Sequence, residues 1–226
     1  MQLNIEDVAK LLGISEKNLF HLIAEKKFPA HKINDQYRFV RSEILEWATV
    51  NKKSFNPELI QETKEKGVLQ PSLEKSLEAG GIVYRLQGRD RESIIRSLVQ
   101  SLPLPPEEDQ SFVFELILAR EMLGLTGIGD GVAIPHPRSP LIFNLSQPTI
   151  MLSFLEQPIT FGATDEEPVF AMFCILSLTA RGHIHMTSRL AYALQDSKFR
   201  EAIQQQECRE TILSELNRVE RSLLSS

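Results

Sequence analysis

The sequence predicts a small helical domain with a β-hairpin, followed by an α/β domain with a mixed sheet and helices on both faces. Three observations indicate this order: short helical patterns at the start, a polar segment punctuated by prolines and a glycine, and alternating strand and helix patterns after it. The expected organisation is a first domain at 1–53, a linker at 54–71 and a second domain at 72–226.

The first domain shows the order helix, turn, helix, hairpin and helix. Apolar residues at helical spacing predict a helix over 5–12 that ends at Gly13. Ser15 is a good N-cap for the second helix. The alternating segment 32–40 predicts a small hairpin, and Ser42 caps a third helix. This order is that of a winged helix-turn-helix.

The second helix of such a motif enters the major groove of DNA with its N-terminal residues foremost, while nearby basic residues contact phosphates. Residues 1–53 carry 9 basic and 7 acidic side chains, a net charge of +2. Because this charge is low, a helical module that binds protein stays open as the alternative. The candidate DNA-contacting residues are Ser15, Lys17, Asn18, His21, Lys26, Lys27 and Arg38.

The second domain alternates between strand and helix patterns. The run at 169–176 is apolar on both faces, which is typical of a strand covered by helices on each side. The expected elements are a strand at 81–87, helices at 91–102 and 105–122, strands at 149–155 and 169–176, and helices from residue 184 to the end.

His136 stands in an unusual setting, after a glycine-rich stretch, between two prolines and close to Arg138. No Ser or Cys nucleophile signature lies nearby. A neutral imidazole can itself be a nucleophile, and a guanidinium can hold phosphoryl oxygens through charge-assisted hydrogen bonds. These residue types therefore suit phosphoryl acceptance, while a structural or metal-binding histidine stays open from chemistry alone.

The first domain resembles the excisionase/MerR-type DNA-binding domain over almost all of its length. The matching marks are the VAKLLGIS turn, the helix ending LIAEKKFPA, the YRFVRSEI segment and the tryptophan of the last helix. The resemblance implies binding to duplex DNA. A second copy would supply the other half-site, which makes a homodimer natural.

The segment from about 72 to 226 resembles the enzyme IIA domain of the fructose/mannitol class of the phosphoenolpyruvate-dependent phosphotransferase system, its nitrogen-regulatory branch in particular. The marks are LAREMLGLTGIGDGVAIPHPR, LEQPITFGATDEEPV and HIHMTSRLAYALQDSKFREAI. The resemblance implies that His136 is phosphorylated, that Arg120 steadies the phosphoryl group, and that His183 is the second active-site histidine. The expected phosphate-binding residues are Arg120, Gly127, Gly129 and Arg138.

The sequence departs from that family at two informative places. Pro137 follows the histidine where glycine is usual, and proline has no backbone N–H to offer a phosphate. Asp130 stands where asparagine is common, which adds a negative charge near an expected anion site. These changes put the rate of phosphotransfer in doubt.

The two resemblances together imply a DNA-binding transcriptional regulator that is phosphorylated on His136 by an HPr-type histidine phosphocarrier. Two alternatives stay open: a component that relays phosphate to a separate IIB protein in sugar uptake, and a docking or sensor protein that binds a target and is not phosphorylated. We expect a phosphocarrier rather than a self-contained enzyme, with no cofactor. We expect no metal site either, because His183 and His185 would face different ways on a helix.

The composition also limits the compartment. The longest apolar run is far shorter than a membrane span, and the start of the chain lacks the pattern of a signal peptide. Two cysteines cannot make a disulfide framework. The sequence therefore predicts a cytoplasmic protein without membrane insertion.

Overall fold

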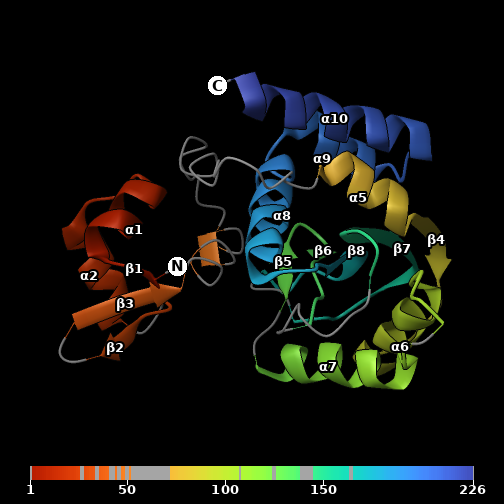
Figure 1. The fold of residues 1–226 in the computed structure, drawn as a ribbon, viewed down its shortest axis with the longest axis horizontal. Coiled ribbons are helices and arrows are strands. Elements are labelled where there is room, and N and C mark those ends of the chain that lie inside the picture. Colours follow the sequence, from red (N-terminus) through yellow and green to blue (C-terminus); the bar gives the residue numbers. More distant parts are fainter. Residues whose placement is uncertain are drawn as a thin grey trace.

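The structure is a computed structural model, and it places most of the chain in helices and strands (Figure 1). The described residues are 2–25, 28–33, 36–40, 44, 47–48, 51, 72–106, 108–123, 126–137, 145–162 and 165–225. We call the described part of 2–51 the head and that of 72–225 the body. The linker expected at 54–71, and the predicted site residues Lys26, Lys27 and Arg138, lie outside the described residues.

The head begins with two helices whose ends are fixed by their own side chains. In α1 (Ile5–Leu12), the side chain of Asn4 accepts from the backbone N–H of Asp7 at 2.9 Å, and the Asp7 carboxylate accepts from that of Asn4 at 3.0 Å. Gly13 ends α1 in the left-handed region, with φ of 61°. Ser15 caps α2 (Glu16–Ala24). Both predicted helices are confirmed.

A small sheet completes the head. β2 (His31–Ile33) and β3 (Gln36–Val40) pair antiparallel, as predicted for the hairpin. A third strand, β1 (Gln2–Leu3), was not predicted, and it pairs with the other edge of β3. Of the third predicted helix, the described residues Ile44, Trp47 and Ala48 are helical. The head core contains Val8, Leu11, Leu12, Leu19, Phe28, Phe39, Ile44 and Ala48.

The body is built around a mixed five-stranded sheet with the order β4-β7-β8-β6-β5. β4 pairs parallel with β7 and β6 parallel with β8, while β7–β8 and β5–β6 are antiparallel. The strands are β4 (Ile82–Leu86), β5 (Gly127–Gly129), β6 (Val132–Ala133), β7 (Thr149–Ile159) and β8 (Val169–Leu176). The helices are α5 (Leu73–Gly80), α6 (Arg91–Ser101), α7 (Gln110–Leu123), α8 (Ala180–Ala193), α9 (Ser197–Gln204) and α10 (Arg209–Ser225).

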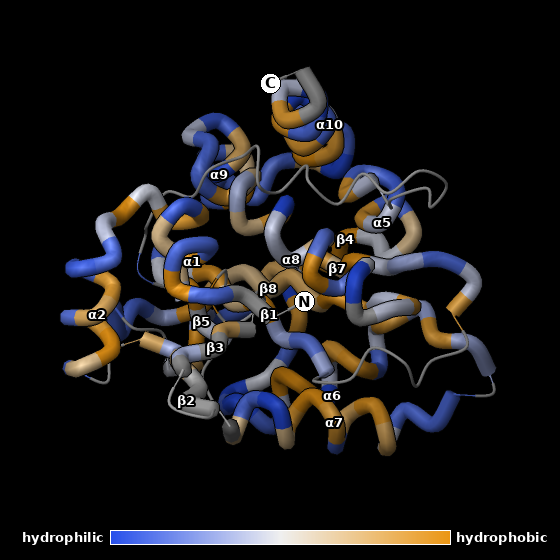
Figure 2. Tube along the Cα trace, turned by 60° about the vertical axis from the view of Figure 1, so that its left-hand side comes forward, coloured by the Kyte–Doolittle hydropathy of each residue, from blue (hydrophilic) through white to orange (hydrophobic). Residues whose placement is uncertain are grey.

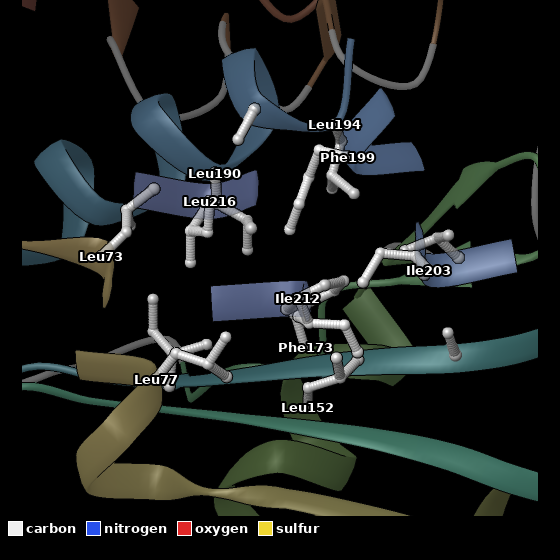
Figure 3. Close-up of a cluster of buried hydrophobic side chains, with 14 of the residues drawn as sticks. Leu73, Leu77, Leu152, Phe173, Leu190, Leu194, Phe199, Ile203, Ile212 and Leu216 are labelled. Atoms are coloured by element: carbon white, nitrogen blue, oxygen red, sulfur yellow. The ribbon is translucent and has the colours of Figure 1, made fainter. Parts of the chain in front are cut away.

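Helices cover both faces of the sheet, which confirms the predicted α/β class. α5, α8, α9 and α10 pack on one face and α6 and α7 on the other (Figure 1). On the first face, side chains such as Phe173, Leu190 and Ile212 meet between sheet and helices (Figure 3). The sheet strands β7 and β8 are hydrophobic in Figure 2, between helices whose residues alternate between hydrophobic and hydrophilic. β8 spans the predicted residues and is buried along nearly all of its length.

Two predicted helix starts were wrong. The helices expected from residue 184 begin earlier, with α8 at Ala180. We expected the helix before Met122 to open at Pro105, but α7 begins only at Gln110. The carboxylate of Asp109 accepts from the backbone N–H of Ser111 at 2.8 Å, and the Asp109 carbonyl accepts from Val113. Asp109 therefore caps the helix, and Pro105 lies in the turn ahead of it.

A buried carboxylate joins three parts of the body. Glu220 on α10 accepts from the Ser72 hydroxyl at 2.8 Å, from the backbone N–H of Leu73 at 2.8 Å and from that of Glu74 at 3.2 Å. It also pairs with the guanidinium of Arg189 on α8 at 2.9 Å. Glu220 therefore serves as a tertiary cap for α5, and it ties that helix to α8.

Within the described ranges, no helix combines the length and the apolar character that crossing a membrane requires.

Candidate functional site

The two histidines that the sequence analysis singled out lie side by side. His136 follows β6 in an extended segment, and His183 lies in the first turn of α8. Their ring centroids are 4.8 Å apart, with an angle of 42° between the ring planes. Both are buried, at 4% and 9% exposure. The parallel pairing of β6 with β8, and the helix that follows β8, bring these distant residues to one edge of the sheet.

The hydrogen bond of His136 determines which ring nitrogen is nucleophilic. Nδ1 lies 2.8 Å from the carbonyl oxygen of Ile134. A carbonyl oxygen can only accept, so the neutral ring carries its proton on Nδ1. In this tautomer the lone pair is on Nε2, and this is the atom that can attack an electrophile.

The N-terminus of α8 adds a favourable field for an anion. Thr179 caps this helix, and its hydroxyl accepts from the backbone N–H of Gly182 at 2.9 Å. The backbone N–H of His183 donates to the carbonyl oxygen of Thr179. The positive end of the helix dipole therefore lies in the turn that carries the His183 ring, where it favours negative charge.

A chain of hydrogen bonds leads from α7 to His136. Arg120 and Glu121 are consecutive on α7, and Glu121 is 1% exposed. The Glu121 carboxylate accepts from the backbone N–H of Thr126 at 3.1 Å and from its hydroxyl. The Thr126 carbonyl accepts from the N–H of Ile134, whose own carbonyl holds the His136 ring. Glu121 was not among the predicted site residues, although it adjoins Arg120 in the REMLG segment.

The environment of Glu121 predicts a pH effect on stability. Burial raises the pKa of Glu121, opposed in part by the bonds from Thr126 and the positive charges of Arg91 and Arg120. The folded state thus binds this proton more tightly than the unfolded state. Its contribution to stability is full at acid pH, below the unfolded pKa, and is lost as pH rises through the folded pKa.

We expect Glu121→Gln, which has no such proton, to gain stability relative to the parent as pH rises. The measurement is the urea midpoint of both proteins from about pH 4 to pH 7, the range that begins near the ordinary pKa of glutamate. Glu92→Gln on the exposed side of α6 is the control, and it should gain no stability relative to the parent over this range. A Glu121→Gln variant that gains none either would contradict the effect.

The predicted glycines lie on the hairpin that leads to His136. In the β5–β6 hairpin Gly127 pairs with Ala133 and Gly129 with Val132. Both glycines are buried. Their role as phosphate donors stays a prediction.

Asp130 lies in the turn of the same hairpin, at the end away from His136. Its carboxylate pairs with the guanidinium of Arg200 on α9 at 3.1 Å, and its backbone N–H donates to Asp165 at 2.8 Å. The charge that the sequence analysis placed near the expected anion site is thus balanced by α9. The neighbouring Gly131 has φ of 72°, and a Cβ there would overlap the ring of Phe170, so glycine is required.

Ser177 is a buried hydroxyl that the sequence analysis missed. It directly follows β8 and is 1% exposed, and its hydroxyl finds no hydrogen-bond partner in the portion of the chain that the structure describes. The backbone N–H of Ile175 donates to the carbonyl oxygen of Pro135 at 3.4 Å. Ser177 therefore lies at the same sheet edge as His136. In the sequence, the one sign of a special role for Ser177 is that this hydroxyl residue ends an apolar run.

The described residues contain no group of three or more His, Cys, Asp or Glu side chains that could hold a metal ion. His185 is buried on α8, two residues after His183. Burial raises the pKa of the Cys174 thiol to about 12, so this cysteine is not a reactive thiolate.

In the head, the predicted DNA-contacting residues Ser15, Lys17 and Asn18 lie at the start of α2, and His21 lies in its last turn. Lys17, Asn18 and His21 are exposed, whereas the Ser15 hydroxyl accepts from the backbone N–H of Asn18 at 3.2 Å and so serves the helix cap. Arg38 lies on β3, and its side chain is outside the described part. Phe20 on the outer side of α2 is 46% exposed and makes an edge contact with Tyr37.

A pocket of about 270 Å³ lies beside α2. Its lining combines apolar side chains with two polar ones. The lining residues are Leu12, Ile14, Asn18, His21, Leu22 and Trp47.

The fold and the paired histidines define a phosphotransferase-system protein of the enzyme IIA type. The sequence model of the phosphoenolpyruvate-dependent sugar phosphotransferase system, EIIA 2, matches residues 75–219, and a helix-turn-helix domain model matches residues 3–51. The chain therefore belongs to the EIIA 2 family and carries an N-terminal helix-turn-helix domain. This combination is that of a regulatory phosphotransferase-system protein.

Relatives support the nitrogen-regulatory branch. The chain is 38% identical over 114 residues to a nitrogen regulatory protein of Escherichia coli (strain K12), covering 48% of this chain and 64% of that protein. It is 32% identical over 117 residues to one of Bradyrhizobium diazoefficiens, covering 51% and 74%. The chain thus spans less than two thirds of the length of the first of these relatives.

A solved structure agrees with these relatives. The crystal structure of nitrogen regulatory protein IIA-Ntr from Neisseria meningitidis is similar, with a TM-score of 0.56 and 29% identity. The match covers 64% of this chain and 98% of that one. It corresponds to most of the body, and the head is an addition to the fold of that protein.

Proposed function

We propose that this protein is a DNA-binding transcriptional regulator that accepts a phosphoryl group on Nε2 of His136 from an HPr-type histidine phosphocarrier. The observation that carries the proposal is the hydrogen bond from Nδ1 of His136 to the Ile134 carbonyl at 2.8 Å. This bond keeps the lone pair on Nε2, the atom that would attack phosphorus.

The reaction is a transfer between two imidazoles. The Nε2 lone pair of His136 forms the new N–P bond as the N–P bond of the carrier breaks, and the carrier imidazole leaves with the electron pair. The protein's task is to position the ring and to stabilise charge on the phosphoryl oxygens. The His183 ring and the N-terminus of α8 lie close enough to stabilise the charge on the phosphoryl oxygens. We assign the same task to Arg120.

The test is a direct measurement of phosphorylation. The protein is incubated with enzyme I, an HPr-type carrier and phosphoenolpyruvate, and its intact mass is read under alkaline conditions, which preserve phosphohistidine. We expect a gain of one phosphoryl group in the parent and none in His136→Ala. No gain with any of several carriers would overturn the phosphocarrier proposal and would favour a docking protein, with Pro137 as the first residue to restore to glycine.

DNA binding is proposed from the exposed start of α2. Lys17 is exposed on this helix, and a lysine at this place in a helix-turn-helix lies close to phosphates. We expect Lys17→Glu to weaken binding to all duplex sequences, and to lower the slope of log K against log salt by about 1.

The measurement for Lys17→Glu is fluorescence anisotropy of labelled duplex at several salt concentrations. Lys198→Glu on the exposed side of α9 makes the same charge change in the body and is the matched control. Equal losses in the two variants would point to net charge rather than to a contact by α2.

A further inference from the structure

The head and the body share a hydrophobic cluster through one helix. Ala191 of α8 is 1% exposed and belongs to the head core, and Ile184 and Tyr192 of α8 pack against the same core. Neither Ala191 nor Ile184 belongs to the body cores on either face of the sheet. Figure 1 shows α8 at the edge of the body nearest the head. We call Ile184, Ala191 and Tyr192 the outer face of α8.

The same helix carries the candidate site. His183 lies beside His136, and the next residue, Ile184, lies on the outer face. Side-chain bonds brace this part of α8, since the Thr187 hydroxyl donates to the His183 carbonyl at 2.9 Å and the Ser188 hydroxyl to the Ile184 carbonyl at 2.6 Å. A displacement of the His183 backbone is therefore passed directly to Ile184.

The contact leaves the DNA-facing side of the head open. Glu16, Lys17, Asn18, Phe20 and His21 are all exposed on α2. Docking on α8 therefore does not cover α2 but fixes its direction relative to the body. In a dimer, that direction would set the spacing between two copies of α2, which must match the half-site spacing of the DNA.

We propose that the outer face of α8 is a switchable docking surface for the chain's own head, and that phosphorylation of His136 releases the head from it. This inference rests on the proposed function. A phosphoryl group adds roughly −1.5 to −2 charges and strong acceptor oxygens next to His183. The negative charge attracts the His183 ring and the N-terminal turn of α8 toward the phosphoryl oxygens. Ile184 moves with this turn.

The size of the contact suits a switch. α8 contributes one buried alanine and two partly buried side chains. Small interfaces between domains of one chain open readily, so a local shift at Ile184 is enough to change the docked fraction.

The chain holds its own probe of docking. Trp47 is the sole tryptophan of the sequence, and it packs against the shared cluster with its ring centroid 4.6 Å from that of Phe28. Release of the head exposes this cluster to water, and the emission of a tryptophan moves to longer wavelength as its surroundings become more polar.

The experiment compares the Trp47 emission of the full chain and two variants. Ala191→Glu puts a charge into the shared cluster without entering either body core, and Gln195→Glu makes the same charge change at an exposed position just after α8. We expect a red shift in Ala191→Glu and none in Gln195→Glu. Ile184→Ser is the second variant, with the same red shift expected, and circular dichroism verifies that each variant is folded.

Phosphorylation is then followed by mass and by emission in the same sample. We expect the Trp47 emission of the parent to shift on phosphorylation toward that of Ala191→Glu. The emission of Ala191→Glu should shift no further on phosphorylation. The emission of His136→Ala should stay unchanged. A parent that gains the phosphoryl group while its emission stays unchanged overturns the switch and leaves the proposed phosphocarrier function standing. A parent that gains no phosphoryl group overturns both. Parent-like emission in folded Ala191→Glu and Ile184→Ser overturns the docking surface itself.

Discussion

Replacing His183 by alanine is expected to slow phosphorylation of His136 by about 10²–10³-fold, the loss typical of one preorganised donor to a charged transition state. The His183 ring lies 4.8 Å from the His136 ring, so it is close enough to hold an oxygen of a phosphoryl group on Nε2. The backbone of α8 and its dipole remain in the variant, which is why the rate should fall rather than vanish. The measurement is the initial rate of mass gain with a phosphorylated HPr-type carrier.

The control for this variant is His21→Ala, which removes an exposed imidazole from the head. It should be phosphorylated at the parent rate. His183→Gln keeps a side-chain donor at the same helix position and should recover part of the rate. A rate in His183→Ala equal to that of His21→Ala would show that His183 is only a neighbour of the reacting ring.

Replacing Glu220 by alanine is expected to lower the free energy of unfolding by about 3–5 kcal/mol. The carboxylate is 6% exposed and accepts from Arg189, the Ser72 hydroxyl and two backbone N–H groups of α5. Its removal leaves a buried guanidinium without this partner and the first backbone N–H groups of α5 without this acceptor. The expected fall in Tm is roughly 6–20 °C for a chain of this size.

Glu92→Ala is the matched control for that loss. Glu92 pairs with Arg96 at 2.9 Å on the outer side of α6, and both side chains are more than half exposed. Such a pair contributes about 0.3–0.5 kcal/mol. If Glu220→Ala and Glu92→Ala unfolded at the same temperature, the buried network would not be a source of stability.

Local patterns predicted many elements well because the causes of those elements are local. The cap Ser15 and the turn residue Gly13 were predicted to start α2 and to end α1, and both do so. The unbroken apolar run of β8 predicted a strand covered on both faces, and the structure buries it there. The predicted start of α7 was wrong. It was placed at Pro105 because proline is tolerated in the first turn of a helix, but Asp109 caps the helix further along the chain.

The candidate site was predicted in its residue types and not in its geometry. His136, Arg120 and His183 were singled out from motifs, and the structure brings the two histidines together. Gly127 and Gly129 lie on β5, which pairs with β6 ahead of His136, and their phosphate-binding role stays a prediction. Glu121 and Ser177 were missed because their burial depends on strands and helices that are remote in sequence.

The sequence by itself determined most of the longer helices and strands and the two classes of fold, since periodicity and caps are properties of short segments. Only the tertiary structure decided the pairing of β6 with β8 and the placing of the head core against α8. Both arrangements depend on which apolar surfaces, remote in sequence, are buried against one another. No short segment contains that information, because burial is a property of the assembled chain.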